Sequence, residues 1–179
     1  MRDAHYALVG YVKSPVGEFV EQLRGELHPQ LPHLAAHLTI LPPRLLRGSE
    51  QSAREQVEET CGATEPFEIM LGTVETFVPI TPTVYVRVTH ASNRMRELHD
   101  RLNTKVLECQ EEWPYIPHLT IVKMNTEAEA QRAYEMAHDR WNDYRGPRRI
   151  RLTELTFVRE GQEHQWRDLA QVRLGNDRG

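Results

Sequence analysis

A four-residue sequence, His-Leu-Thr-Ile, occurs twice in this chain, at positions 37–40 and 118–121. Both copies lie in runs rich in β-forming residues. Because side chains alternate between the two faces of a strand, the histidine and the threonine of each copy are predicted to share one face. The leucine and isoleucine then share the other face, which can pack under helices. The polar residues that this pattern singles out are His37, Thr39, His118 and Thr120.

Two imidazoles and two hydroxyls that face one space suit phosphoryl chemistry without a metal. One neutral imidazole can take a proton from the nucleophile while the other, protonated, gives a proton to the leaving oxygen. The threonine hydroxyls can donate hydrogen bonds to non-bridging phosphate oxygens and hold the phosphorus for in-line attack. Since the two copies are alike, the sequence leaves open which histidine is the base and which is the acid.

The elements around the two motifs repeat as well. Strand 7–12, helix 15–27 and strand 36–41 match strand 83–89, helix 93–109 and strand 116–124. The patterns also predict helices at 49–61 and 126–144, and strands at 67–78, 150–160 and 166–174, with a hairpin at 161–164. Because no low-complexity linker divides the halves, we expect one α+β domain over residues 1–179, with α/β alternation and two pseudo-symmetric lobes.

Composition excludes several classes of protein. Hydrophobic residues make up 39% of the 179 positions, enough to bury a core, and no apolar run approaches the roughly 18 residues that span a bilayer. The net charge of −4 argues against binding of long duplex nucleic acid by phosphate neutralisation, but it is compatible with a small anionic ligand. Cys61 and Cys109 fit no metal-ligand spacing. We expect a cytoplasmic monomer with no membrane partner, metal or cofactor.

Five further residues are weaker candidates for contacts with a substrate. Thr83, Tyr85 and Arg87 share one face of a strand predicted to neighbour the second motif, where they could stack on a base and contact phosphate. An ordinary exposed strand face explains them equally well. Lys123 follows the second motif, but it reaches the histidine face only if the strand ends or bulges there. Arg44 follows the first motif in a predicted loop and could reach an anion.

Two His-x-Thr-x motifs about eighty residues apart resemble those of the 2H phosphoesterase superfamily, which includes the 2′-5′ RNA ligase-like proteins and cyclic phosphodiesterases. The stretches HLTILPP, FVPITPTVYVRV, YIPHLTIVK and ELTFVREG are most similar to its small bacterial YjcG-like branch. One departure is Leu41-Pro42-Pro43, which stands where the RNA ligase-like branch usually has Phe-Leu-Gly.

The resemblance extends over most of the chain and implies a bilobal fold. In it, two antiparallel sheets face a central cleft and the helices lie outside. It also implies metal-independent attack on 2′,3′-cyclic phosphates or 2′,5′-linked phosphodiesters of nucleotides or RNA ends. By position, the residues that would line the cleft are His37, Thr39, His118 and Thr120.

Two functions of different class stay open. The first is a phosphodiesterase in which the histidines divide the base and acid roles. The second is a non-catalytic protein that binds a nucleotide or an RNA end in the same cleft. A zinc hydrolase built on His33 and His37 is disfavoured, because Pro32 and the β-forming run argue against the helix that this spacing requires.

Overall fold

The computed structural model describes residues 3–175. The chain alternates strands with helices. In order, the elements are β1 (Tyr6–Tyr11), α1 (Pro15–Leu27), β2 (His37–Arg44), α2 (Glu50–Gly62), β3 (Phe67–Thr76), β4 (Thr83–His90), α3 (Ser92–Leu102), β5 (His118–Lys123), α4 (Glu127–Asp143), β6 (Arg149–Leu152), β7 (Glu154–Glu160) and β8 (Trp166–Arg173). The predicted α+β class is therefore confirmed. No helix in this range has the length and apolar content that crossing a membrane requires.

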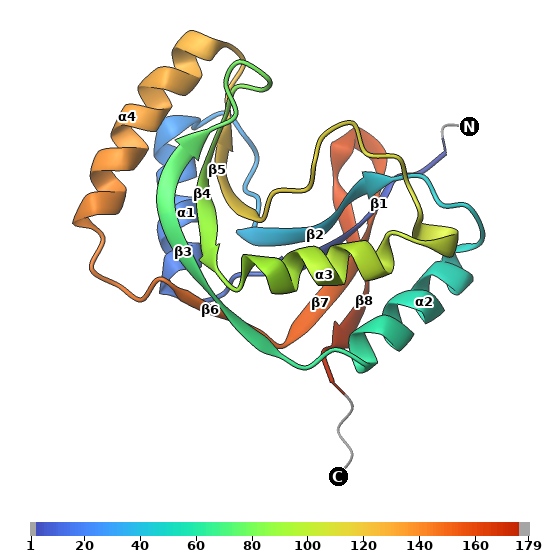
Figure 1. The fold of residues 1–179 in the computed structure, drawn as a ribbon. Coiled ribbons are helices and arrows are strands. Elements are labelled where there is room, and N and C mark those ends of the chain that lie inside the picture. Colours follow the sequence, from blue (N-terminus) through green and yellow to red (C-terminus); the bar gives the residue numbers. More distant parts are fainter. Residues whose placement is uncertain (1–2, 176–179) are drawn as a thin grey trace.

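The eight strands form one sheet in the order β6-β3-β4-β5-β2-β1-β7-β8. Every pair is antiparallel. This corrects the expectation of two sheets, because β2 and β5 pair at Leu38 and Leu119 and so join two four-stranded halves. Figure 1 shows that the sheet is strongly curved, so that the two halves are inclined to each other across this junction.

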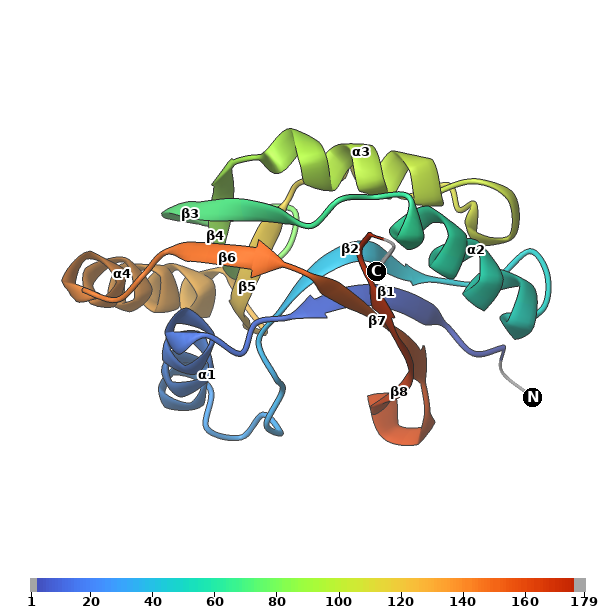
Figure 2. The same ribbon diagram turned by 90° about the horizontal axis from the view of Figure 1, so that it is seen from below.

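The two halves match strand by strand outward from the junction. β5, β4, β3 and β6 on one side correspond to β2, β1, β7 and β8 on the other. The helices exchange partners between the halves: α1, which follows β1, packs on β5, whereas α3, which follows β4, packs on β2. Figures 1 and 2 place α4 at one end of the molecule, with α1 near it, and α2 at the other end. Each motif strand is therefore supported by the helix of the opposite repeat.

Strand alternation places the core and the site on opposite faces of the sheet. Leu38, Ile40, Leu119 and Ile121 are fully buried in the main hydrophobic core, together with residues of all four α-helices. The histidine and threonine of each motif lie on the other face and are half-buried. Burying these four aliphatic side chains stabilises the fold by roughly 1.5–3 kcal/mol each, which ties the strand positions to core packing.

Three predicted boundaries were wrong. The strand predicted at 150–160 is two strands, since β6 pairs with β3 in one half and β7 pairs with β1 in the other. Strand β2 continues through its two prolines to Arg44. Helix α3 ends at Leu102 because the side-chain oxygen of Asn103 accepts hydrogen bonds from Arg44 and from the Cys109 backbone, which turns the chain there. The predicted hairpin between the last two strands is confirmed.

Candidate active site

The two motifs lie side by side at the centre of the sheet. Leu38 and Leu119 are opposite one another on antiparallel strands. In such a ladder the residue before one partner faces the residue after the other, so His37 neighbours Thr120, and the other threonine neighbours the other histidine. The histidines are then diagonal neighbours on one face, a relation in which Cβ atoms are about 7 Å apart in a regular sheet. A single phosphate group can fit between two rings so placed.

Both motif strands carry a bulge directly after the threonine. On β2, the pairing steps from Val9 opposite Thr39 to Leu8 opposite Leu41, so that one residue of β2 is left without a partner. On β5 the register shifts in the same way after Thr120. A bulge bends the strand and interrupts the alternation of its side chains. The two residues after each threonine are consequently both buried.

Each histidine ring is held by a backbone carbonyl two residues earlier. His37 Nδ1 lies 2.9 Å from the oxygen of Ala35, and His118 Nδ1 lies 2.6 Å from the oxygen of Ile116. A carbonyl oxygen can only accept a hydrogen bond, so Nδ1 must carry the proton in both rings. In the neutral form, Nε2 of each ring is left as an acceptor. The same tautomer is therefore imposed twice, in the form that a general base needs.

Burial lowers the pKa of both histidines, because a charged imidazolium is poorly solvated there. For His37, the hydrogen bond to Ala35 acts in the opposite direction, and the positive charge of Arg24 lowers the pKa further. For His118, the bond to Ile116 raises the pKa, and a positive charge on His37 lowers it. The two rings thus interact electrostatically, and protonating one disfavours protonation of the other.

The threonine side chains and backbones have different roles. Neither the Thr39 nor the Thr120 hydroxyl has a hydrogen-bond partner within residues 3–175, so both can donate to a ligand. Their backbone carbonyls, in contrast, are held by side chains from elsewhere in the chain. The Tyr115 hydroxyl donates to the Thr39 oxygen at 2.8 Å, and Arg24 Nη2 donates to the Thr120 oxygen at 3.1 Å.

Arg24 is a buried cation that connects three segments. From α1 its guanidinium donates to the backbone oxygens of Thr120 and Ile121 on β5 and to that of Leu34 before β2. Only 7% of the residue is exposed, and among the described residues no carboxylate forms an ion pair with it. Burial lowers the pKa of Arg24, and the nearby Glu21 raises it. The guanidinium thereby braces the backbone beneath both motifs.

Three of the weaker candidates share the histidine face. Arg87 is directly opposite His118, and Tyr85 is opposite Thr120. The Arg87 guanidinium is engaged by Glu75 through two hydrogen bonds, of 2.6 and 3.2 Å. Thr83 is buried, and its hydroxyl lies 3.0 Å from that of Thr81. Arg87 and Tyr85 are thus both direct neighbours of the second motif in the ladder, and the Tyr85 ring also contacts that of His118, with 5.2 Å between centroids.

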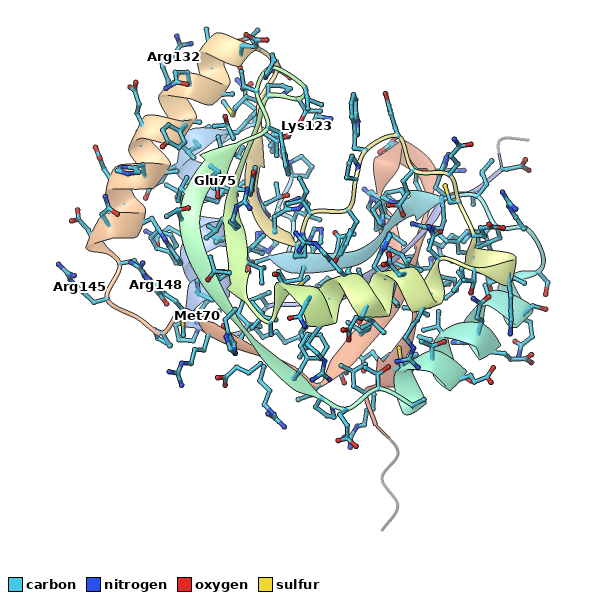
Figure 3. All side chains as sticks on the ribbon, viewed as in Figure 1. Met70, Glu75, Lys123, Arg132, Arg145 and Arg148 are labelled. Atoms are coloured by element: carbon cyan, nitrogen blue, oxygen red, sulfur yellow. The ribbon has the colours of Figure 1, made fainter. Side chains whose placement is uncertain are left out.

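The two remaining candidates, Lys123 and Arg44, differ in whether the side chain is available to a ligand. The bulge after Thr120 brings Lys123 opposite Thr83, and therefore onto the histidine face. Figure 3 shows Lys123 at the end of β5, close to the loop between β3 and β4. Arg44, by contrast, ends β2 rather than lying in a loop. It is 2% exposed and forms a 2.6 Å ion pair with Glu111, so its charge is already neutralised.

The structure adds a pocket beside the first motif that the sequence analysis did not identify. Its volume is about 160 Å³. The residues that line it are Ala7, Val9, Tyr11, Leu34, His37, Thr39, Pro43, Val158 and Trp166. Tyr11 is opposite His37 on β1, as Arg87 is opposite His118 on β4. Comparing the two repeats would have identified Tyr11, but nothing local in the sequence points to Trp166.

Comparisons with known proteins give a family match, sequence relatives and structures of similar fold. The family model described as "2'-5' RNA ligase superfamily" matches residues 12–164. A protein of Oceanobacillus iheyensis named "Putative phosphoesterase OB1230" is 26% identical over 144 residues, which cover 79% of this chain and 76% of that protein. A protein of Halalkalibacterium halodurans named "Putative phosphoesterase BH1439" is 25% identical over 118 residues, 65% of this chain and 68% of the relative.

Solved structures share the fold at low sequence identity. The protein TT0787 of Thermus thermophilus aligns over 97% of this chain and 99% of its own, with a TM-score of 0.66 and 14% identity. LigT of E. coli in complex with 3'-AMP aligns over 98% of this chain and 100% of its own, with a TM-score of 0.62 and 15% identity. The curved sheet and its helices are therefore an arrangement that distant sequences also adopt.

Proposed function

The chain belongs to the 2′-5′ RNA ligase superfamily, a family of phosphoesterases, and from this premise we propose that it is a metal-independent phosphodiesterase. Its substrates are nucleotides or RNA ends that carry a 2′,3′-cyclic phosphate or a 2′,5′-linkage. Nucleotide ligands are supported by the structures of E. coli LigT in complex with 3'-AMP, ATP and NADP+. The catalytic groups are the two histidines, and the two threonines hold the phosphate.

One observation carries this proposal: on each of two paired strands, a backbone carbonyl holds Nδ1 of a histidine and so leaves its Nε2 to act as base or acid. In the proposed step, one Nε2 takes a proton from water as the water oxygen bonds to phosphorus. The bond from phosphorus to a ribose oxygen breaks, and the protonated Nε2 of the other ring gives its proton to that oxygen. The tautomer imposed by the two carbonyls suits either ring to either role.

The threonine hydroxyls are proposed to bind the non-bridging phosphate oxygens. Replacing Thr39 or Thr120 by valine keeps the shape but removes a hydrogen bond to a charged group, so kcat/KM is expected to fall roughly 10- to 100-fold. Serine at either position should retain most of the activity. Thr153→Val, at an exposed threonine between β6 and β7, is the matched control. Unchanged kinetics in both valine variants would contradict this role.

The lowered histidine pKa values predict a specific pH profile. The active enzyme needs one neutral and one protonated imidazole, so kcat/KM rises through one apparent pKa of the pair and falls through the other. Because burial lowers the pKa of both rings, the optimum is expected on the acidic side of the ordinary imidazole value of about 6.5. A profile of kcat/KM against pH that is flat from 5 to 8 would contradict paired-histidine catalysis.

A binding protein that uses the same cleft without turnover is the alternative. The experiment that separates the two is incubation of the purified protein with 2′,3′-cyclic mononucleotides and 2′,5′-linked dinucleotides in EDTA, with products resolved by chromatography. The His37→Ala/His118→Ala double variant is run in parallel. Turnover by the parent alone supports the enzyme and identifies the phosphate product. If the parent binds the nucleotides without turning them over, the binding protein is the better description.

A further inference from the structure

The segment before each motif is linked to the threonine of the other motif. In each repeat, the residue two positions before the histidine supplies the carbonyl that orients its ring, and the residue before that one carries the link. In the first repeat this residue is Leu34, whose backbone oxygen accepts from Arg24, which also donates to the Thr120 oxygen. In the second repeat it is Tyr115, whose hydroxyl donates directly to the backbone oxygen of Thr39 at 2.8 Å. The two repeats thus make the same crossed link by different means.

The strand ladder alone gives Thr39 incomplete support. The bulge after Thr39 leaves one residue of β2 without a partner on β1, and among the described residues β2 pairs with β5 at Leu38 and Leu119 alone. Because a bulge disrupts the ladder locally, the peptide that follows Thr39 needs another support, and the Tyr115 hydroxyl provides it. The carbonyl and the side chain of Thr39 share one Cα atom. Holding the carbonyl therefore limits the directions in which the threonine hydroxyl can point.

The Tyr115 ring is itself fixed by a buried cluster of side chains. It stacks on the buried imidazole of His99, with 4.2 Å between centroids and 2° between the ring planes. His99 Nε2 lies 2.7 Å from a carboxylate oxygen of Glu111, and Glu111 forms a 2.6 Å ion pair with the buried Arg44. Burial raises the pKa of Tyr115, and the negative charge of Glu111 raises it further, so the hydroxyl keeps the proton that it donates. Tyr115 therefore presents a fixed donor to Thr39.

We propose that Tyr115 is a positioning residue for the reaction: its hydroxyl holds Thr39 in the orientation in which the threonine binds the phosphate, and joins it to the segment that orients His118. The inference rests on the proposed function, in which Thr39 holds the phosphate. It adds a residue that acts through this threonine rather than on the substrate. Without the Tyr115 hydroxyl, the His118 ring still has its edge-on contacts with Phe77 and Tyr85, at 5.0 and 5.2 Å between centroids. The main effect of losing the hydroxyl is therefore expected at Thr39.

A cycle of double variants tests whether Tyr115 acts through Thr39. Tyr115→Phe keeps the stacked ring but loses the donor, so it is expected to lower kcat/KM for 2′,3′-cyclic AMP roughly 2- to 10-fold, the usual effect of losing one hydrogen bond. In a Thr39→Val background, which lacks the hydroxyl that Tyr115 positions, the same substitution should have little further effect. In a Thr120→Val background the full factor should remain. Equal factors in the two valine backgrounds would overturn the inference, because a general structural defect acts on both alike.

Tyr144→Phe is the matched control for this substitution. Tyr144 also stacks on an aromatic ring, that of Trp141, and its hydroxyl also donates to a backbone oxygen, that of Pro147. These contacts lie at the end of α4, outside the site. Tyr144→Phe should therefore leave kcat/KM unchanged. A loss as large as that of Tyr115→Phe would show that losing any such hydroxyl has this effect, and would also overturn the inference.

A measurement of side-chain motion keeps this inference separate from the proposed activity. The order parameter of the Thr39 methyl group is determined by NMR in the parent and in Tyr115→Phe, with melting temperatures to verify folding. The Thr120 methyl group is the internal reference, because Arg24 rather than Tyr115 holds the backbone oxygen of that residue. A fall at Thr39 alone supports the positioning role even if the parent shows no turnover. If the order parameter of Thr39 does not fall, or both fall equally, the inference is wrong whether or not the parent is active.

Discussion

Replacing His118 by alanine is expected to lower kcat/KM for a 2′,3′-cyclic nucleotide at least ~100-fold, within the ~10²–10⁴ typical of a lost general acid or base. Replacing His37 should have an effect of similar size, because each ring supplies the Nε2 that the other step requires. Each substitution removes a half-buried side chain from a strand whose leucine and isoleucine fill the core. Because the core residues are unchanged, the fold should persist.

The double variant tests whether the two histidines act in one step. If they do, removing the second ring should lower kcat/KM by a much smaller factor than removing the first, because the effects of groups that act as a unit are strongly non-additive. His90→Ala is the control, with the same change at an exposed histidine at the end of β4. Near-parental activity in His118→Ala with normal folding would exclude the paired mechanism. Losses that simply multiply would show that the rings act in separate steps.

Replacing Arg24 by methionine is expected to reduce both stability and activity. The backbone oxygens of Leu34, Thr120 and Ile121 would lose their donor. Each buried acceptor left unpaired costs about 1–3 kcal/mol, so we expect a loss of roughly 3 kcal/mol or more in the free energy of unfolding. For a chain of this size that corresponds to a fall in Tm of about 10 °C. Urea unfolding and thermal melts measure this directly.

The pH profile distinguishes an electrostatic effect of Arg24 from a purely structural one. Its positive charge lowers the pKa of His37, so Arg24→Met should shift the limb of the profile that belongs to His37 to higher pH. Arg24→Lys keeps the charge but cannot reproduce the fork of donors, so it should lose stability without that shift. Arg140→Met, at an exposed ion pair with Glu26, should change neither. Identical profiles for the methionine and lysine variants would show that Arg24 only supports the fold.

Arg24 and Tyr115 show how the repeats are interlocked. Each holds the backbone oxygen of a motif threonine, and each comes from outside the strand that it supports. The ring of Tyr115 stacks on that of His99 on α3, with 4.2 Å between centroids. His99 Nε2 in turn lies 2.7 Å from a carboxylate oxygen of Glu111, which also forms an ion pair with Arg44. One motif is therefore braced by a single cation and the other by a chain of side chains.

Local sequence patterns were enough to identify the residues of the candidate site and the strand faces on which they lie. Alternation along a strand is a local property, so two copies of His-Leu-Thr-Ile were sufficient to place His37 and Thr39 on one face and Leu38 and Ile40 on the other. The composition and periodicity of the remaining segments led to the α+β class in the same way. Local patterns also left Lys123 undecided, because its face depends on a bulge that becomes visible only in the register of β4 with β5.

The pairing of distant strands, in contrast, could not be predicted from local patterns. The pairing of β2 with β5, which merges two expected sheets into one, joins residues 81 positions apart and depends on the packing of the whole core. Long-range packing also determines the burial of Arg44 against Glu111, the hydrogen bonds from Arg24 to β5 and the pocket between Tyr11 and Trp166. Contacts of this kind bring together segments that have no common local pattern. They form because only one arrangement of the strands buries all of their apolar faces at once. The shape of the site follows from that arrangement.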